Sequence, residues 1–111
     1  MDYNKLCTDI LGLDTNVRFA GEIRFGGQRE GIKTLLTPEQ TKISNLQALV
    51  RWELRNSLSH KIGREKYSME EYEKIKRIIF TLDADHILLV TTEVNTEHMK
   101  VIDSILKQLG K

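Results

Sequence analysis

The chain has 111 residues, of which 40% are hydrophobic and 30% are charged, enough for one globular domain (1–111) with its own core. Its 17 lysines and arginines nearly balance 16 acidic residues, and the net charge of +1 argues against a dedicated nucleic-acid-binding protein. The single cysteine, Cys7, excludes an internal disulfide, and no apolar run approaches the ~20 residues of a membrane span, so we expect a cytoplasmic protein without membrane contact.

The first predicted element is an amphipathic helix over residues 2–13. Its apolar side chains recur at helical spacing and share one face: Leu6, Ile10 and Leu13. Cys7 lies beside Leu6, and we expect it to be a small buried packing residue and not a nucleophile.

A β-hairpin is expected next. Residues 17–25 alternate between two faces, which predicts a half-buried strand. One face carries Val17, Phe19, Gly21, Ile23 and Phe25, and the other carries Arg18, Ala20, Glu22 and Arg24. Gly26 and Gly27 indicate a tight turn into a second strand over residues 29–36, in which Gly31 would mark a bulge.

The chain is organised around a long helix, predicted over residues 37–63. Thr37 can cap the first turn, Pro38 falls where a missing N–H costs nothing, and Gln40 can complete a capping box. Gly63 follows the last periodic residue and can adopt the left-handed conformation that ends a helix.

Two faces of this helix carry hydrophobic side chains. At about 100° per residue one face forms an aliphatic stripe, which should pack on the core: Ile43, Leu46, Val50, Leu54 and Leu58. Trp52, the sole tryptophan, projects to the opposite side, where tryptophan beside arginine is typical of an interface hot spot. The candidate interface consists of Leu49, Trp52, Arg55, Asn56 and Ser59. The alternative is that another element of the chain, such as a terminal helix, covers this second face.

Further strands should follow the long helix. Residues 67–74 fit a helical capping box as well as a strand, so their conformation stays open. A hairpin is predicted from residues 75–82 and 86–92, because both segments are rich in β-branched and aliphatic residues around a short Asp-containing turn.

A closing helix is predicted at the C-terminus. Asn95 or Thr96 should cap it, Leu109 should end it, and Gly110 should terminate it. Its apolar face would carry Met99, Ile102, Ile105, Leu106 and Leu109.

The element order is therefore α-β-β-α-β-(β)-β-α. It predicts an α+β fold, a single domain in which an antiparallel sheet carries a long central helix and N- and C-terminal helices. The soft metal ligands do not show the spacing of a metal site: Cys7, His60, His86 and His98. The sequence also shows no pattern of nucleophile, base and orienting group. We therefore expect a protein that is not an enzyme and that binds no cofactor and no metal.

This order resembles the roadblock/LC7 group of small domains, with longin and profilin folds as looser relatives. The matching segments are the strand ending at Phe25, the helix from Pro38, the strand containing Ile87-Leu88-Leu89-Val90 and the C-terminal helix. The chain also looks like small archaeal proteins that carry Gly-Gly-Gln-Arg-Glu-Gly (26–31) and Tyr-Glu-Lys-Ile-Lys-Arg (72–77) stretches.

The resemblance implies a non-enzymatic protein. Domains of this group typically pair through the long helix and a neighbouring edge strand, and they often scaffold or regulate small GTPases. By this analogy the chain is a homodimeric interaction module with a protein partner such as a small GTPase.

Two other functions stay open. A PAS- or profilin-like small-molecule sensor would need a pocket lined from Phe19, Phe25, Phe80 and the aliphatic stripe. A protein associated with nucleic acid would use the basic side chains of the long helix and its exit: Arg51, Arg55, Lys61, Arg64 and Lys66. Acidic neighbours dilute this patch, so we expect no nucleic-acid partner.

Overall fold

The computed structural model describes residues 2–24, 27–29, 37–84 and 86–111. Its helices are α1 (Tyr3–Leu11), α2 (Pro38–Arg55), a 3-10 turn η1 (Asn56–Leu58), α3 (Ser59–Ile62) and α4 (His98–Gln108). Its strands are β1 (Val17–Arg24), β2 (Gly27–Arg29), β3 (Tyr67–Glu71), β4 (Ile75–Thr81) and β5 (His86–Glu93). The predicted α+β class is confirmed, and the open segment after the long helix is the strand β3.

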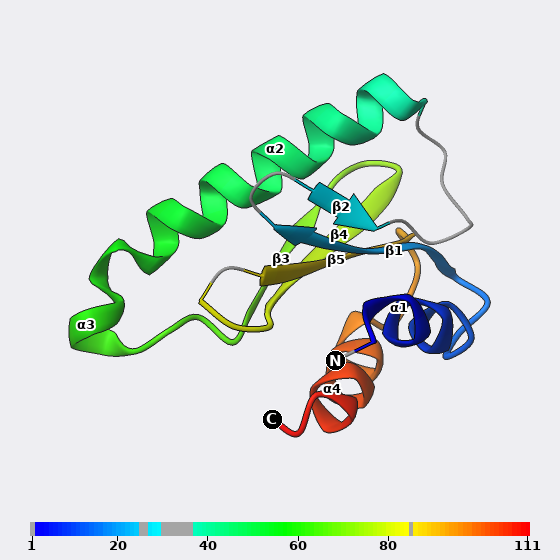
Figure 1. The fold of residues 1–111 in the computed structure, drawn as a ribbon. Coiled ribbons are helices and arrows are strands. Elements are labelled where there is room, and N and C mark those ends of the chain that lie inside the picture. The colour runs from blue at the N-terminus through cyan, green and yellow to red at the C-terminus, as the bar shows by residue number, and fades with distance from the viewer. Residues whose placement is uncertain (1, 25–26, 30–36, 85) are drawn as a thin grey trace.

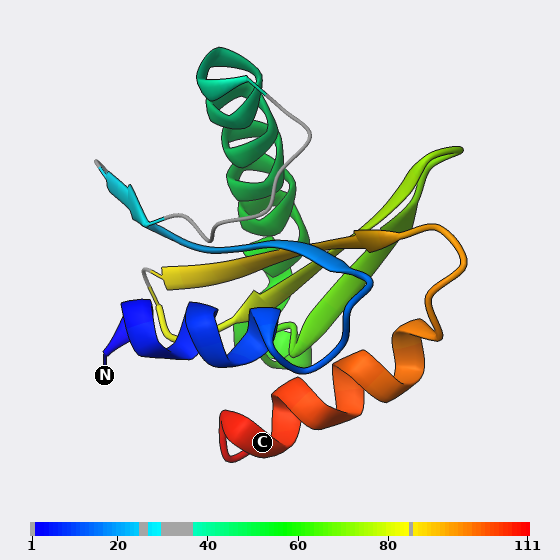
Figure 2. The same ribbon diagram turned by 90° about the vertical axis from the view of Figure 1, so that its right-hand side faces the viewer.

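The strands form one antiparallel sheet in the order β2-β1-β5-β4-β3. The helix α2 lies over one face of this sheet, and α1 and α4 lie on the other, so the domain has three layers (Figures 1 and 2). The predicted hairpin of β4 and β5 is confirmed, with Ile78 opposite Val90. Apolar side chains dominate the middle strands because both faces of the sheet are covered.

The prediction that β1 is half-buried is wrong. β1 lies between β2 and β5, and every one of its residues from Phe19 to Glu22 is buried. The register shifts between Val17 and Phe19, so Val17 packs with Ala20 beneath α1 and α4 while Phe19 packs beneath α2. A shift of one residue exchanges the faces of a strand, which simple alternation cannot anticipate.

The antiparallel pairing of β1 with β2 confirms the predicted hairpin, with Arg24 opposite Gly27. Gly27, predicted to lie in the turn, is instead the first residue of β2. Only the first residue of the predicted second strand (29–36) belongs to β2, and residues 30–36, with the proposed bulge at Gly31, lie outside the described residues. Phe25 and Gly26 lie outside them as well.

The N-terminal helix is shorter than predicted. Asp2 caps α1 by accepting a hydrogen bond from the backbone N–H of Lys5 (3.1 Å). Leu6, Ile10 and Cys7 are buried beneath the sheet as expected, whereas Leu13 lies beyond the end of the helix and is exposed. Its predicted place on the apolar face is therefore wrong.

The closing helix begins later than predicted. Thr96 donates its backbone N–H to Glu93 in a turn, and Glu97 takes the N-cap position without a side-chain cap. The buried face is formed by Val101, Ile102 and Ile105. Met99 lies on the margin of that face and is 48% exposed, so its predicted burial is wrong. Gly110 follows the helix with a φ of +75°, as expected of a terminator.

Candidate protein-interaction surface

Local side-chain chemistry sets the start of α2. The backbone N–H of Gln40 donates to Thr37 Oγ1 (3.2 Å), and Gln40 Oε1 accepts from the backbone N–H of Thr37 (3.1 Å). This is the predicted capping box, with Pro38 in the first turn. The helix continues through η1 and α3, and Gly63 follows with a φ of +86°. The predicted extent of 37–63 is confirmed, with a 3-10 turn near its end.

The orientation predicted for this helix is wrong. The side chains that face the sheet are those of Thr41, Asn45, Ala48 and Trp52. Trp52 is only 6% exposed, whereas every member of the aliphatic stripe is between 46% and 69% exposed. The stripe therefore points away from the domain, on the opposite side of the helix from Trp52.

The contacts of Trp52 explain this orientation. Its ring lies in a core cluster between α2 and the sheet with Phe19, Ala48, Ile79, Ile87 and Leu89. The indole N–H donates to Thr81 Oγ1 on β4 (2.8 Å), so its polar atom is satisfied inside the core. Ala48 allows the helix to approach the sheet closely, and the sheet itself supplies most of the apolar surface. Counting apolar residues around the helix could not show this, because the more apolar face is the one left exposed.

Other residues of the predicted interface are also partly covered by their own chain. Leu49 packs at the edge of the cluster around Trp52, and Ser59 is half-buried. Asn56 Nδ2 donates to the backbone oxygen of Trp52 (2.9 Å). The large hydrophobic side chains that α2 and η1 expose are therefore those of the aliphatic stripe.

Arg55 completes this set and ties the end of α2 to the segment before β3. Its Nε donates to Glu65 Oε2 (2.5 Å), and its Nη2 donates to Ser68 Oγ (2.8 Å). The guanidinium of this predicted interface residue is therefore engaged within the chain.

A polar network fastens α2 to β3 and β4. Arg77 is buried, and its Nε donates to Glu70 Oε1 (2.6 Å). Its Nη1 reaches α2 at Ser44 Oγ (3.0 Å) and Gln47 Oε1 (3.2 Å). Arg51 of α2 forms a second ion pair with Glu70. Residues on three elements thereby hold the helix at a fixed place over the sheet, a role that no sequence pattern indicated.

The network makes the fold sensitive to acid. Burial by itself raises the pKa of Glu70, but the hydrogen bonds and charges of Arg77 and Arg51 outweigh it and hold that pKa below its usual range. A lowered pKa in the folded state gives stability that is present above the unfolded pKa and lost as the pH falls through the folded one.

We therefore expect Glu70→Gln to be less stable than wild type at pH 7, with the difference shrinking below the ordinary glutamate pKa of about 4.3. Urea unfolding followed by circular dichroism at several pH values measures this difference. A difference that stays constant from neutral pH to about pH 3 would contradict the assigned role of Glu70.

Solved structures share this architecture. The Roadblock/LC7 domain from Streptomyces avermitilis matches with a TM-score of 0.75 at 12% sequence identity, over 99% of this chain and 93% of that one. MglB from Myxococcus xanthus matches with a TM-score of 0.75 at 14% identity, over 98% of this chain and 89% of that one. The chain has the roadblock/LC7 fold.

A structure described as MglB with a tetrameric arrangement has the same fold, with a TM-score of 0.71 at 12% identity over 98% of this chain and 82% of that one. These identities are low, so the likeness is one of fold. No protein-family model and no curated protein matches the sequence. The resemblance to archaeal proteins stays a prediction.

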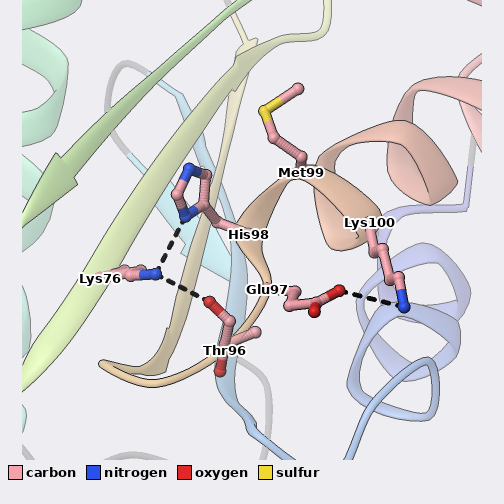
Figure 3. Close-up of a pocket in the computed structure, with 6 residues that line it drawn as sticks. All are labelled: Lys76, Thr96, Glu97, His98, Met99 and Lys100. Carbon is pink, nitrogen blue, oxygen red and sulfur yellow. Dashed lines mark hydrogen bonds and ion pairs between the residues drawn. The ribbon is translucent and has the colours of Figure 1, made fainter.

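A second polar cluster of this chain lies where α4 begins (Figure 3). The buried Lys76 of β4 directs its Nζ to the backbone oxygen of Thr96 (2.7 Å) and to His98 Nδ1 (2.9 Å). Beside it lies a depression of about 370 Å³, lined by Lys76, Thr96, Glu97, His98, Met99 and Lys100. Because α4 has no side-chain cap, the cluster serves to fasten the start of that helix to the sheet.

The pocket predicted for a small-molecule sensor does not form as expected. Phe19 packs with the core beneath α2, whereas Phe80 packs with the core beneath α1 and α4. The two rings lie on opposite faces of the sheet, and the aliphatic stripe faces outward, so they cannot line one pocket. The predicted lining is wrong, and Phe25 lies outside the described residues.

The basic patch is smaller than its residue count suggests. Arg51 and Arg55 are paired with Glu70 and Glu65. The remaining cations are exposed at α3 and its exit: Lys61, Arg64 and Lys66. Across the described ranges, no group of three or more His, Cys, Asp or Glu side chains could hold a metal ion, and no helix is long and apolar enough to cross a membrane.

Proposed function

We propose that this chain is a non-enzymatic, cytoplasmic protein-interaction module that forms a homodimer through α2 and acts as a scaffold or regulator. The observation that carries the proposal is the outward-facing aliphatic stripe. The resemblance to roadblock/LC7 domains implies a small GTPase as the class of protein partner. This part of the proposal is tested by GTP-dependent co-elution of a candidate GTPase with the purified chain.

The stripe has the properties of a binding surface. From Ile43 to Leu58 it spans about 22 Å along the helix, at a rise of about 1.5 Å per residue. Its members are Leu, Ile and Val, and each would contribute about 1.5–3 kcal/mol if transferred fully from water to an apolar contact. Monomeric proteins rarely leave a continuous apolar surface of this kind in water.

The edge of the sheet offers a second surface. In the described sheet β3 is an end strand, paired only with β4. The unpaired backbone groups of an end strand can add a strand from another chain. A solved MglB structure has a tetrameric arrangement, which supports self-association as a property to be tested in this chain.

Substitution within the stripe tests the proposal directly. Leu54 is 69% exposed, so Leu54→Glu should leave the monomer folded while placing an unpaired carboxylate in the contact. We expect the dissociation constant of the dimer to rise at least ~100-fold, equivalent to about 2.7 kcal/mol. Light scattering over a dilution series measures the molar mass, and circular dichroism checks the fold.

Met99→Glu is the matched control, because Met99 is also an exposed apolar side chain on a helix but lies on α4. It should leave the molar mass unchanged. A wild-type chain that is monomeric at every concentration, or a Leu54→Glu variant that dimerises as wild type does, would overturn the proposal.

A further inference from the structure

The long helix ends in a corner that stands clear of the sheet. In Figure 1, α3 extends beyond the sheet, away from α1. Every residue from His60 to Arg64 is exposed, and so is Lys66. Ile62 is 77% exposed, more than any other large hydrophobic side chain of the described residues. We call this surface the basic corner, after its members Lys61, Ile62, Arg64 and Lys66.

The cations of the basic corner have no acidic partner in the part of the chain that the structure describes. Lys61, Arg64 and Lys66 form no ion pair there. Glu65, the acid among them, turns inward: its carboxylate accepts from Arg55 Nε (2.5 Å), and its side chain is only 14% exposed. The charge that this segment presents to solvent is therefore positive, although the whole chain carries a net charge of only +1.

The base of the corner is fastened to the rest of the domain. Glu65 donates its backbone N–H to Asn56 Oδ1 (3.0 Å), which ties the segment before β3 back to η1. The backbone oxygen of Lys66 accepts from the backbone N–H of Thr81 on β4 (3.2 Å). The backbone that carries the cations is thus held in place before a partner binds, and this lowers the entropic cost of binding.

We infer that the basic corner is a docking site for an acidic, partly apolar segment of a partner protein. Carboxylates of that segment would meet the ammonium and guanidinium groups, and an aliphatic side chain would cover Ile62. The inference rests on the interaction role in the proposed function and adds the chemistry of the partner. The corner follows Leu58, the last residue of the aliphatic stripe, so the two surfaces present different side chains.

Two other anionic partners fit the corner less well. Single-stranded nucleic acid is held by aromatic side chains as well as by cations, and the only tryptophan, Trp52, is buried beneath α2. An anionic membrane attracts each basic side chain by about 1 kcal/mol, and three such contacts with one isoleucine fall short of a stable anchor. An acidic protein segment offers carboxylates and apolar atoms together, as the corner requires.

Fluorescence anisotropy with a labelled peptide tests this inference. The probe is a short fluorescein-labelled peptide in which glutamates flank leucines. Two matched peptides carry glutamine in place of glutamate, or serine in place of leucine. At low salt the probe should bind, and each matched peptide should bind at least ~10-fold more weakly, because one loses the charge and the other the apolar contact. The affinity for the probe should also fall as salt is added.

Substitutions in the corner locate the site. Arg64→Glu should raise the dissociation constant of the probe at least ~10-fold at low salt, because it replaces an attraction with a repulsion. Ile62→Ser should raise it about 10-fold through the lost apolar contact. Both positions are exposed, so both variants should fold as wild type does, which circular dichroism checks. Lys107→Glu is the control for net charge, since Lys107 is exposed in the last turn of α4, and it should bind the probe as wild type does.

Failure of this inference is distinguishable from failure of the proposed dimer. A wild-type chain that dimerises in light scattering but does not bind the probe, or that binds it equally well after Arg64→Glu, overturns the docking site and leaves the dimer standing. A chain that is monomeric but binds the probe overturns the dimer and supports the docking site. Tighter binding of a mixed-sequence oligonucleotide, or of vesicles rich in phosphatidylserine, than of the probe overturns the assignment to a protein partner.

Discussion

Replacing Trp52 with alanine should lower the free energy of unfolding by about 3–5 kcal/mol, the cost typical of removing a large aromatic side chain from a core. The ring is almost completely buried between α2 and the sheet, and it packs against Phe19 and Ile79. The substitution also leaves Thr81 Oγ1 without the indole N–H that donates to it. A loss of this size is a large share of the stability of an ordinary domain.

The measurement is urea unfolding followed by circular dichroism in the Leu54→Glu background, so that association does not contribute. Leu46→Ala is the control, because Leu46 is 62% exposed and should change the stability of the monomer by less than about 0.5 kcal/mol. If both substitutions lower the free energy of unfolding equally, the burial of Trp52 against the sheet is contradicted. Trp52→Glu would not report on assembly alone, because it places a charge in the core.

Replacing Arg77 with methionine should lower the free energy of unfolding by about 3 kcal/mol, the lower end of the cost of breaking a buried ion pair. Arg77 joins Glu70 of β3 to Ser44 and Gln47 of α2, so its loss removes the hydrogen bonds that tie these side chains to β4. Glu70 keeps its ion pair with Arg51, which limits the loss.

The comparison is Arg18→Met, measured by the same urea unfolding. Arg18 forms an ion pair with Glu93, but the two side chains are 32% and 35% exposed, and such surface pairs contribute about 0–1 kcal/mol. Equal losses in the two variants would show that the Arg77 network adds nothing beyond a surface ion pair.

The capping box at Thr37 and Gln40 places the start of α2 through contacts between residues three apart, so the sequence could predict it. The same holds for the hairpin of β4 and β5, where two apolar segments flank a short turn. In these cases the physical cause lies within a few residues. The resemblance to roadblock/LC7 domains depended on such elements and their order, and the fold confirms it.

Which side of α2 faces the sheet depends on residues far apart in the chain. The stripe was recognisable from its spacing, but the partner of each helical face was not. Ala48 and Trp52 pack on side chains of β1, which precedes α2 in the chain, and of β4 and β5, which follow it. The Arg77 network likewise joins α2 to β4 through residues that are 33 and 30 positions apart in sequence.

The sequence by itself therefore determined most of the elements of this protein and the aliphatic stripe, because local backbone and side-chain interactions specify these. It left residues 67–74 open between helix and strand, and the structure shows β3 there. Only the tertiary structure decided that Trp52 faces the core and that the stripe faces solvent. The physical reason is that one sheet face can bury only one side of a helix. The mixed side of α2 with Ala48 and Trp52 packs on this sheet, and the more apolar side remains exposed.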